Sequence, residues 1–191
     1  MTLDLITALQ KNDKDAKRML FDLYFSRFAA IAARYAKSHI QAEELLGQAF
    51  EKCYYALQLQ RFDAGIDPDV SIENSFISEC IVFVKNIRSE YYVSSTVHPT
   101  SNNSTKNYNL FENNEVIDFN NVEIENLIKA LQKMVPAQRL VFNLHVIDGF
   151  SLAEVAAKLE TSEETVKSNL EKARFNFQKN IEKDLKSNTV I

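Results

Sequence analysis

A run of hydroxyl, carboxylate and cationic side chains near the C-terminus has the chemistry of a nucleic-acid contact surface. The candidate residues are Ser162, Glu164, Thr165, Lys167, Ser168, Lys172 and Arg174. Polar side chains of these kinds hydrogen bond to base edges, and cations neutralise phosphates. Between residues 167 and 186, six cations stand against three anions, although the whole chain has a net charge of −4. A solvated helix with cations toward its C-terminal end would show the same charge, so charge alone does not separate the two interpretations.

Two helices joined by a sharp turn are expected to position these residues. Ser151 and Glu154 have the spacing of a capping box, and Ser162 is an N-cap for the next helix. Each helix carries an apolar face, listed in order as Leu152, Val155 and Leu159, then Val166, Leu170, Ala173 and Phe177. This pattern predicts a helix-turn-helix, which a plain helical hairpin would mimic. Two further helices are expected upstream, one over 122–135 with an apolar side that includes Ile124, and one that Pro136 opens and Asp148-Gly149 ends. The second has Leu140, Val141, Leu144 and Ile147 on its apolar face.

The N-terminal half also has helical periodicity. Apolar stripes are formed by Leu20, Tyr24, Phe28, Ile31 and Tyr35, and then by Leu46, Phe50, Cys53 and Leu57. Residues 61–70 read as a loop, and a helix with a wide apolar face follows between residues 71 and 92. Residues 93–121 are dense in Asn, Ser and Thr and predict a flexible polar linker. We therefore expect an all-α protein with two helical domains, 1–92 and 122–191, joined by the linker 93–121.

Composition argues against several other classes of protein. Only 3 Gly and 3 Pro in 191 residues disfavour an all-β fold. His39, His98 and His145 lie in separate segments without paired carboxylates or a glycine-rich phosphate loop, so we expect no catalytic residues, no metal site and no cofactor. Cys53 and Cys80 are isolated and are expected to be buried thiols. The sequence shows no signal peptide and no stretch long enough to span a membrane, and so predicts a cytoplasmic protein.

The chain resembles the bacterial sigma-70 family of RNA polymerase initiation factors, and in particular its two-domain extracytoplasmic-function group. The resemblance is most specific in the C-terminal half, where it rests on Pro136, Arg139, Val141-Phe142, Leu144, Asp148-Gly149, Ser151, Glu154-Val155-Ala156, Leu159, Ser162, Thr165-Val166-Lys167-Ser168, Leu170 and Lys172-Ala173-Arg174. These residues are similar to region 4 of the family, and a short leading helix followed by residues 13–35 and 41–57 is similar to region 2. One departure is Glu160, which stands where the family usually has glycine and would be strained if its φ were positive.

The resemblance implies partners and roles. Core RNA polymerase would bind the helix around Glu43, Glu44, Leu46, Gln48 and Phe50. Region 4 would read the upstream promoter element through the helix that follows Ser162. Region 2 would hold the downstream element as a single strand near Lys85, Asn86, Arg88, Tyr91 and Tyr92. An anti-sigma factor is a further implied partner.

Two other functions are compatible with the sequence. The first is a stand-alone helix-turn-helix regulator whose N-terminal bundle dimerises or senses a ligand. The second is a degenerate sigma-like protein that binds a partner without binding DNA. A regulator of the first kind would bind duplex DNA specifically without polymerase. A protein of the second kind would keep its function after loss of Lys167 and Lys172.

Overall fold

A computed structural model describes residues 3–59, 67–86 and 122–188, with side chains up to residue 184. These residues form helices and no strand, which confirms the all-α prediction. The chain divides into two compact units, Met1–Val84 and Lys85–Ile191. The predicted linker, 93–121, lies outside the described residues. Among the described helices, none is long and apolar enough to cross a membrane.

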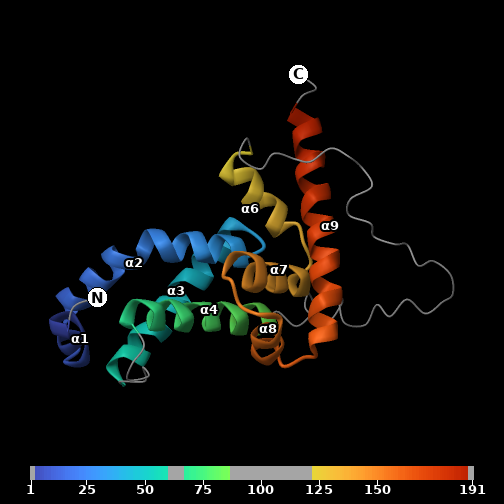
Figure 1. Cartoon of the computed structure of the whole chain (residues 1–191). Coiled ribbons are helices and arrows are strands. Elements are labelled where there is room, and N and C mark those ends of the chain that lie inside the picture. The colour runs from blue at the N-terminus through green and yellow to red at the C-terminus, as the bar shows by residue number, and fades with distance from the viewer. Residues whose placement is uncertain (1–2, 60–66, 87–121, 189–191) are drawn as a thin grey trace. The chain divides into compact units, whose positions relative to one another are not determined.

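The N-terminal unit is built from α1 (Leu3–Gln10), α2 (Lys14–Tyr35), α3 (His39–Gln58) and most of α4 (Pro68–Asn86) (Figure 1). Local caps set where these helices begin. The Asp13 carboxylate accepts a hydrogen bond from the Ala16 amide at 2.8 Å, and the Ser38 hydroxyl accepts one from Gln41 at 3.3 Å. Each bond satisfies a first-turn amide that the helix itself cannot pair.

Aromatic rings connect α2, α3 and α4 through the core of this unit. Phe28 and Phe76 are both fully buried, with ring centroids 4.1 Å apart. Phe50 of α3 contacts Phe28 from the side, with centroids 5.1 Å apart. Two polar contacts also join α2 to α4: the Tyr24 hydroxyl donates to Asp69, and Arg27 pairs with Glu73. The aromatic packing and these polar links fix the three helices as one bundle.

The predicted stripe of α3 is buried only in part. Cys53 and Leu57 are buried as expected, and the rest of the buried face is Ala42, Leu45 and Ala49. Leu46 and Phe50 are half-buried at its edge, where the Phe50 ring still contacts the buried Phe28.

The predicted loop over 61–70 is also too long, because α4 already begins at Pro68. Proline suits the first turn of a helix, where its missing amide hydrogen costs nothing. Asp67 precedes it and accepts a hydrogen bond from the Asp69 amide at 2.7 Å. Cys53 and Cys80 are buried free thiols, as predicted, and burial raises the pKa of Cys53 to about 12.

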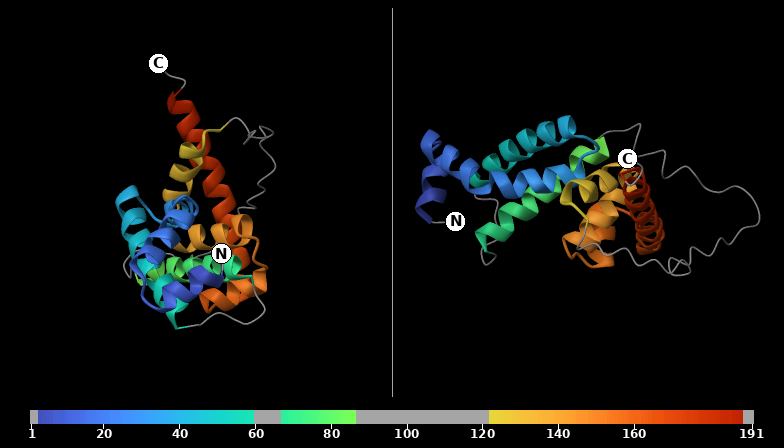
Figure 2. Two further views of the ribbon diagram at one scale, coloured as in Figure 1. Left: turned by 90° about the vertical axis from the view of Figure 1, so that its left-hand side faces the viewer. Right: turned by 90° about the horizontal axis from the view of Figure 1, so that it is seen from above.

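The C-terminal unit contains α6 (Ile124–Gln132), α7 (Pro136–Phe142), a π-helical turn (Asn143–Ile147), α8 (Leu152–Leu159) and the 26-residue α9 (Glu163–Asn188). Helices α6, α7 and α8 all pack against α9. Seen from above, α9 is viewed nearly along its axis, and the three shorter helices lie on one side of it (Figure 2). The other side of α9 is therefore left uncovered by α6, α7 and α8.

The π-helical turn changes two expected positions. Pro136 opens α7 and Gly149, with φ of 79°, follows the turn, both as predicted. Ile147, however, is 46% exposed rather than inward. A π turn holds more residues than an α turn and rotates later side chains away from the α-helical face. Ile124, expected on the apolar side of α6, is 64% exposed because it lies in the first turn of that helix, beyond the packed part.

Candidate nucleic-acid interface

The first helix of the predicted helix-turn-helix begins with a complete capping box. The Ser151 amide donates to the Glu154 carboxylate at 2.8 Å, and the Glu154 amide donates to the Ser151 hydroxyl at 3.3 Å. The Ser151 hydroxyl also donates to the same carboxylate, at 2.7 Å. These bonds hold the pKa of Glu154 below its ordinary value. The start of α8 is thus fixed by local chemistry, as the sequence predicted.

The turn between α8 and α9 contains a left-handed residue. Glu160 ends α8 with φ of 56° and ψ of 48°. This residue therefore has the positive φ that strains a residue with a Cβ. The Thr161 amide reaches back to the Ala156 carbonyl at 3.0 Å. This arrangement closes α8 sharply, and α9 begins only three residues later. The tight turn and the buried Ala156 give the helix-turn-helix arrangement.

Ser162 and Thr165, both predicted to contact DNA, are partly used within the protein. The Thr165 amide donates to the Ser162 hydroxyl at 3.2 Å, and the two hydroxyl oxygens lie 3.0 Å apart. Ser162 therefore acts as the N-cap of α9. Its position at the tip of the motif leaves it exposed, but its hydroxyl already has an intramolecular role.

The other predicted DNA-binding residues of α9 all lie on its exposed surface: Glu164, Lys167, Ser168, Lys172 and Arg174. Within the part of the chain that the structure describes, none of these five forms an ion pair. Buried Val166, Leu170 and Ala173 hold the opposite face of the helix against the domain. The helix consequently presents hydroxyl, carboxylate and cationic groups outward from a fixed support.

The second half of α9 anchors that support, and the sequence reading missed this. The Asn180 amide donates to the Ala130 carbonyl in the last turn of α6 at 3.0 Å. Asn176 donates to the Gln138 side chain at 2.7 Å, and Lys133 pairs with Asp184 at 2.5 Å. Periodicity finds the apolar stripe of a helix, but it does not show which carbonyls of another helix need a donor.

Arg139 is a further structural residue that the sequence named only by resemblance. Its side chain is among the largest that are fully buried, with 1% of the residue exposed. It donates to the carbonyls of Gln132 and Met134, at 3.2 and 2.9 Å, where the chain turns from α6 to α7. Charge-assisted bonds to carbonyls that the helix leaves unpaired offset the cost of burying the guanidinium.

The residues predicted to bind polymerase share the outward side of α3. Glu43, Glu44 and Gln48 are exposed, and Leu46 and Phe50 are half-buried beside them. Gln48 donates to Glu44 at 3.1 Å, one helical turn away. No cation is among these five residues, so this face of α3 is acidic and polar with an apolar edge.

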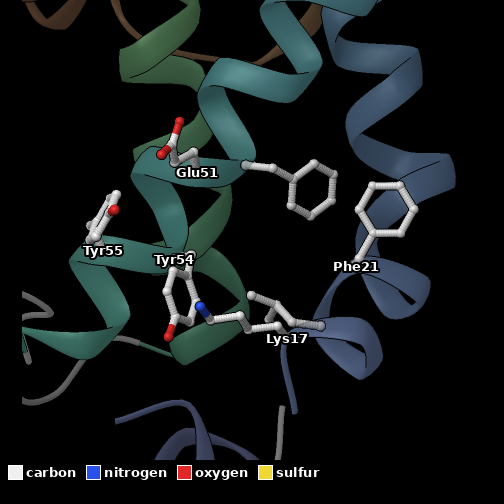
Figure 3. A pocket seen from close by; sticks show the side chains of 7 residues that line it. Lys17, Phe21, Glu51, Tyr54 and Tyr55 are labelled. Atoms are coloured by element: carbon white, nitrogen blue, oxygen red, sulfur yellow. The ribbon is translucent and has the colours of Figure 1, made fainter. Parts of the chain in front are cut away.

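Phe50 also lines a pocket of about 290 Å³ between α2 and α3. Figure 3 shows Phe21 at this pocket, and its ring centroid lies 5.0 Å from that of Phe50. Lys17 lies 4.1 Å above the Tyr54 ring at one end of the pocket, and Glu51 contributes a carboxylate. Half-exposed aromatics around a hollow of this size are typical of a site that receives an apolar side chain.

The five predicted single-strand contacts fall at or after the end of α4, and Tyr92 is among those that lie outside the described residues. Lys85 is half-buried and Asn86 exposed, in the last turn of the helix. Arg88 and Tyr91 lie outside the described residues. Among the described side chains, no group of His, Cys, Asp or Glu could hold a metal ion.

Comparison with known proteins gives one family and a shared fold. Residues 124–174 match the family model for sigma-70, region 4. The sigma factor RpoE, solved in complex with the anti-sigma factor NepR from Bartonella quintana, is similar with a TM-score of 0.53 and 19% identity, over 86% of this chain and 96% of that one. CnrH, solved with the cytosolic domain of CnrY, has a TM-score of 0.47 and 15% identity, over 94% of this chain and 96% of that one. No curated protein matches the sequence.

Proposed function

We propose that this chain, a member of the sigma-70 family, is a transcription initiation factor of the extracytoplasmic-function type that binds core RNA polymerase and directs it to specific promoters. The observation that carries the proposal is the helix-turn-helix of α8 and α9. Its outward polar residues lie within the part of the chain that matches sigma-70 region 4. The role requires selective binding and no chemical step, so we assign no catalytic residue and no cofactor.

In this proposal α9 reads the upstream promoter element. Lys167 and Ser168 lie side by side on the exposed surface near its start and contact base edges in the major groove. Lys172 and Arg174 lie one to two turns later and contact phosphates. Ser162, Glu164 and Thr165 complete the contact surface at the tip. The whole chain has a net charge of −4, which makes its binding to DNA weak in the absence of polymerase, so the affinity depends on polymerase holding the factor in place.

The N-terminal domain, proposed as residues 1–92, docks on polymerase through α3. The exposed carboxylates of Glu43 and Glu44 suit a basic partner surface, and Gln48 adds hydrogen bonding. Leu46 and Phe50 supply the apolar edge, and the pocket beside Phe50 accepts an anchoring side chain. Interfaces commonly concentrate their binding energy in such a pocket with a polar rim.

We assign capture of the opened downstream element to the end of α4 and the residues that follow. Lys85 and Arg88 hold the backbone, Asn86 contacts a base, and Tyr91 stacks on an unpaired base. A linker over 93–121 joins this domain to the second, over 122–191. An anti-sigma factor is a proposed regulatory partner, as for the RpoE that shares this fold. The proposed site of action is the cytoplasm.

Reconstitution with cognate core polymerase tests the function. The expected result is a stable complex and a promoter-specific transcript that neither component gives alone. Replacing the base-reading group in Lys167→Ala should change promoter choice at one position, by about 1–3 kcal/mol. Lys129→Ala, an exposed lysine of α6, is the matched control. Absence of both complex and transcript contradicts the proposal.

Docking is tested separately by charge reversal on α3. Glu44→Lys should weaken polymerase binding at least tenfold, because a like charge is placed against a basic partner. Glu125→Lys makes the same charge change at an exposed position of α6 and should leave binding unchanged. Equal affinities for the two variants would remove α3 from the interface and leave the DNA-reading assignment intact.

A further inference from the structure

The side of α9 that faces away from α6, α7 and α8 carries a line of exposed residues that runs far beyond the helix-turn-helix. Its members, at steps of three or four residues, are Thr165, Ser168, Lys172, Phe175, Lys179 and Lys183, all of them exposed. We call this line the outer stripe. The buried stripe of the same helix, from Val166 to Ile181, lies on the opposite side. The outer stripe has two hydroxyls at its start, three cations later, and no carboxylate.

We propose that Lys179 and Lys183 form a second phosphate-contact site, which grips the DNA backbone beyond the major groove that α9 enters. This inference rests on the proposed function, because it extends the surface through which α9 reads the upstream element. The ligand is the sugar-phosphate backbone of duplex DNA flanking that element. The region 4 match ends at residue 174, so both lysines lie outside it.

Helix geometry supports the placement. At about 1.5 Å per residue, Lys179 lies about 21 Å along the axis from Thr165, and Lys183 about 6 Å further. The major groove is only about 12 Å wide. If Thr165 and Ser168 face the groove, side chains on the same line at these distances reach the phosphates that border it. Buried contacts of Asn180 and Ile181 hold this half of α9 to the domain, so the two lysines are carried on a fixed support.

The helix dipole does not account for the whole stripe. Its effect falls off within the last turn, and α9 continues to Asn188, so Lys172 and Lys179 lie outside its reach. The Lys179 ammonium lies 6.0 Å from the Phe175 ring, which favours a cation held along the stripe. The carboxylates of Glu171 and Glu182 lie on the flanking line of the helix. The three lysines of the stripe, which continue in line with Ser168, outnumber these two carboxylates, and this fits a polyanion that continues in the same direction.

The test measures the salt dependence of binding by the full chain, using fluorescence anisotropy. Two duplexes carry the same upstream element, one with natural flanks and one trimmed at the element's edges. Lys179→Ala/Lys183→Ala should reduce the slope of log affinity against log salt by about two units on the long duplex. It should leave both sequence preference and binding to the trimmed duplex unchanged. Lys179→Arg/Lys183→Arg should restore the slope, and Lys11→Ala/Lys14→Ala, in the other unit, should not alter it.

The outcomes separate this inference from the function it rests on. If the wild-type chain prefers promoter duplex and the double alanine variant keeps the wild-type slope, the second site is absent. If that variant instead loses polymerase-dependent transcription with an unchanged slope, the outer stripe binds an acidic protein, which also overturns the inference. A wild-type chain with neither promoter preference nor promoter-directed transcription contradicts the proposed function itself.

Discussion

Replacing Glu160 by glycine should stabilise the C-terminal unit. The residue has a left-handed backbone, with φ of 56° and ψ of 48°. An L-residue with a Cβ pays about 1–2 kcal/mol for this conformation, and glycine does not. Glycine also loses more conformational entropy on folding than other residues, and this destabilises the variant by about 0.5–1 kcal/mol. The expected net effect of Glu160→Gly is a stabilisation of about 1 kcal/mol.

Glu160→Ala isolates the backbone contribution, because alanine removes the carboxylate but keeps the Cβ. The glycine variant should be more stable than the alanine variant, and the difference between their free energies of unfolding measures the cost of the left-handed backbone conformation. Hydrogen exchange of the α8 and α9 amides is the direct assay, and about 1 kcal/mol corresponds to roughly fivefold slower exchange when both helices open together. Ala157→Gly, one turn earlier at an exposed site within α8, should destabilise by about 0.5–1 kcal/mol. If Glu160→Gly lowers protection as Ala157→Gly does, the strain at Glu160 is not real.

Three further predictions follow from buried and capping contacts. Ile181 is fully buried, so Ile181→Ala should cost about 2–5 kcal/mol in denaturant unfolding, and a cost near zero would place it outside the core. The hydrogen bond from the Tyr24 hydroxyl lowers the pKa of Asp69. The ionised Asp69 carboxylate therefore stabilises the fold at pH values above the ordinary aspartate pKa of about 3.9. This stabilisation is lost as the pH falls through the lowered pKa of the folded state. In Tyr24→Phe the free energy of unfolding should fall less as the pH is lowered through this range. An unchanged pH dependence of the free energy of unfolding would contradict the assignment. Ser151→Ala should destabilise α8 by about 1 kcal/mol and raise the pKa of Glu154, which NMR titration measures; a pKa that stays low would mean that Ser151 does not cause it.

Helix starts were predictable because their causes are local. Ser151 and Ser162 each cap the helix that the sequence assigned to them, since a cap and its amide lie within three residues of each other. The expectation of strain at Glu160 comes from the family resemblance, because glycine usually stands at this position in the family. The outward residues of α9 followed from the helical period alone.

Contacts between distant residues were not predictable in this way. Whether Leu45 or Leu46 faces the core depends on how closely α2 and α3 approach, and no local pattern gives that distance. The π-helical turn that exposes Ile147 has the sequence NLHVI, which continues an α-helical pattern, so the sequence does not indicate it. The buried state of Arg139 depends on carbonyls at positions 132 and 134 that become available only when α6 ends there.

The bond from Asn180 to Ala130 has a consequence for synthesis on the ribosome. The chain is made from its N-terminus, so the last turn of α6 has no donor for this carbonyl until fifty further residues have been added. The last turn of α6 therefore gains this partner only after the second half of α9 has been made. A nascent chain halted at Arg174 would contain the whole region 4 match but would lack Phe177, which packs against the core cluster of Leu131, Met134, Phe142 and Ala173.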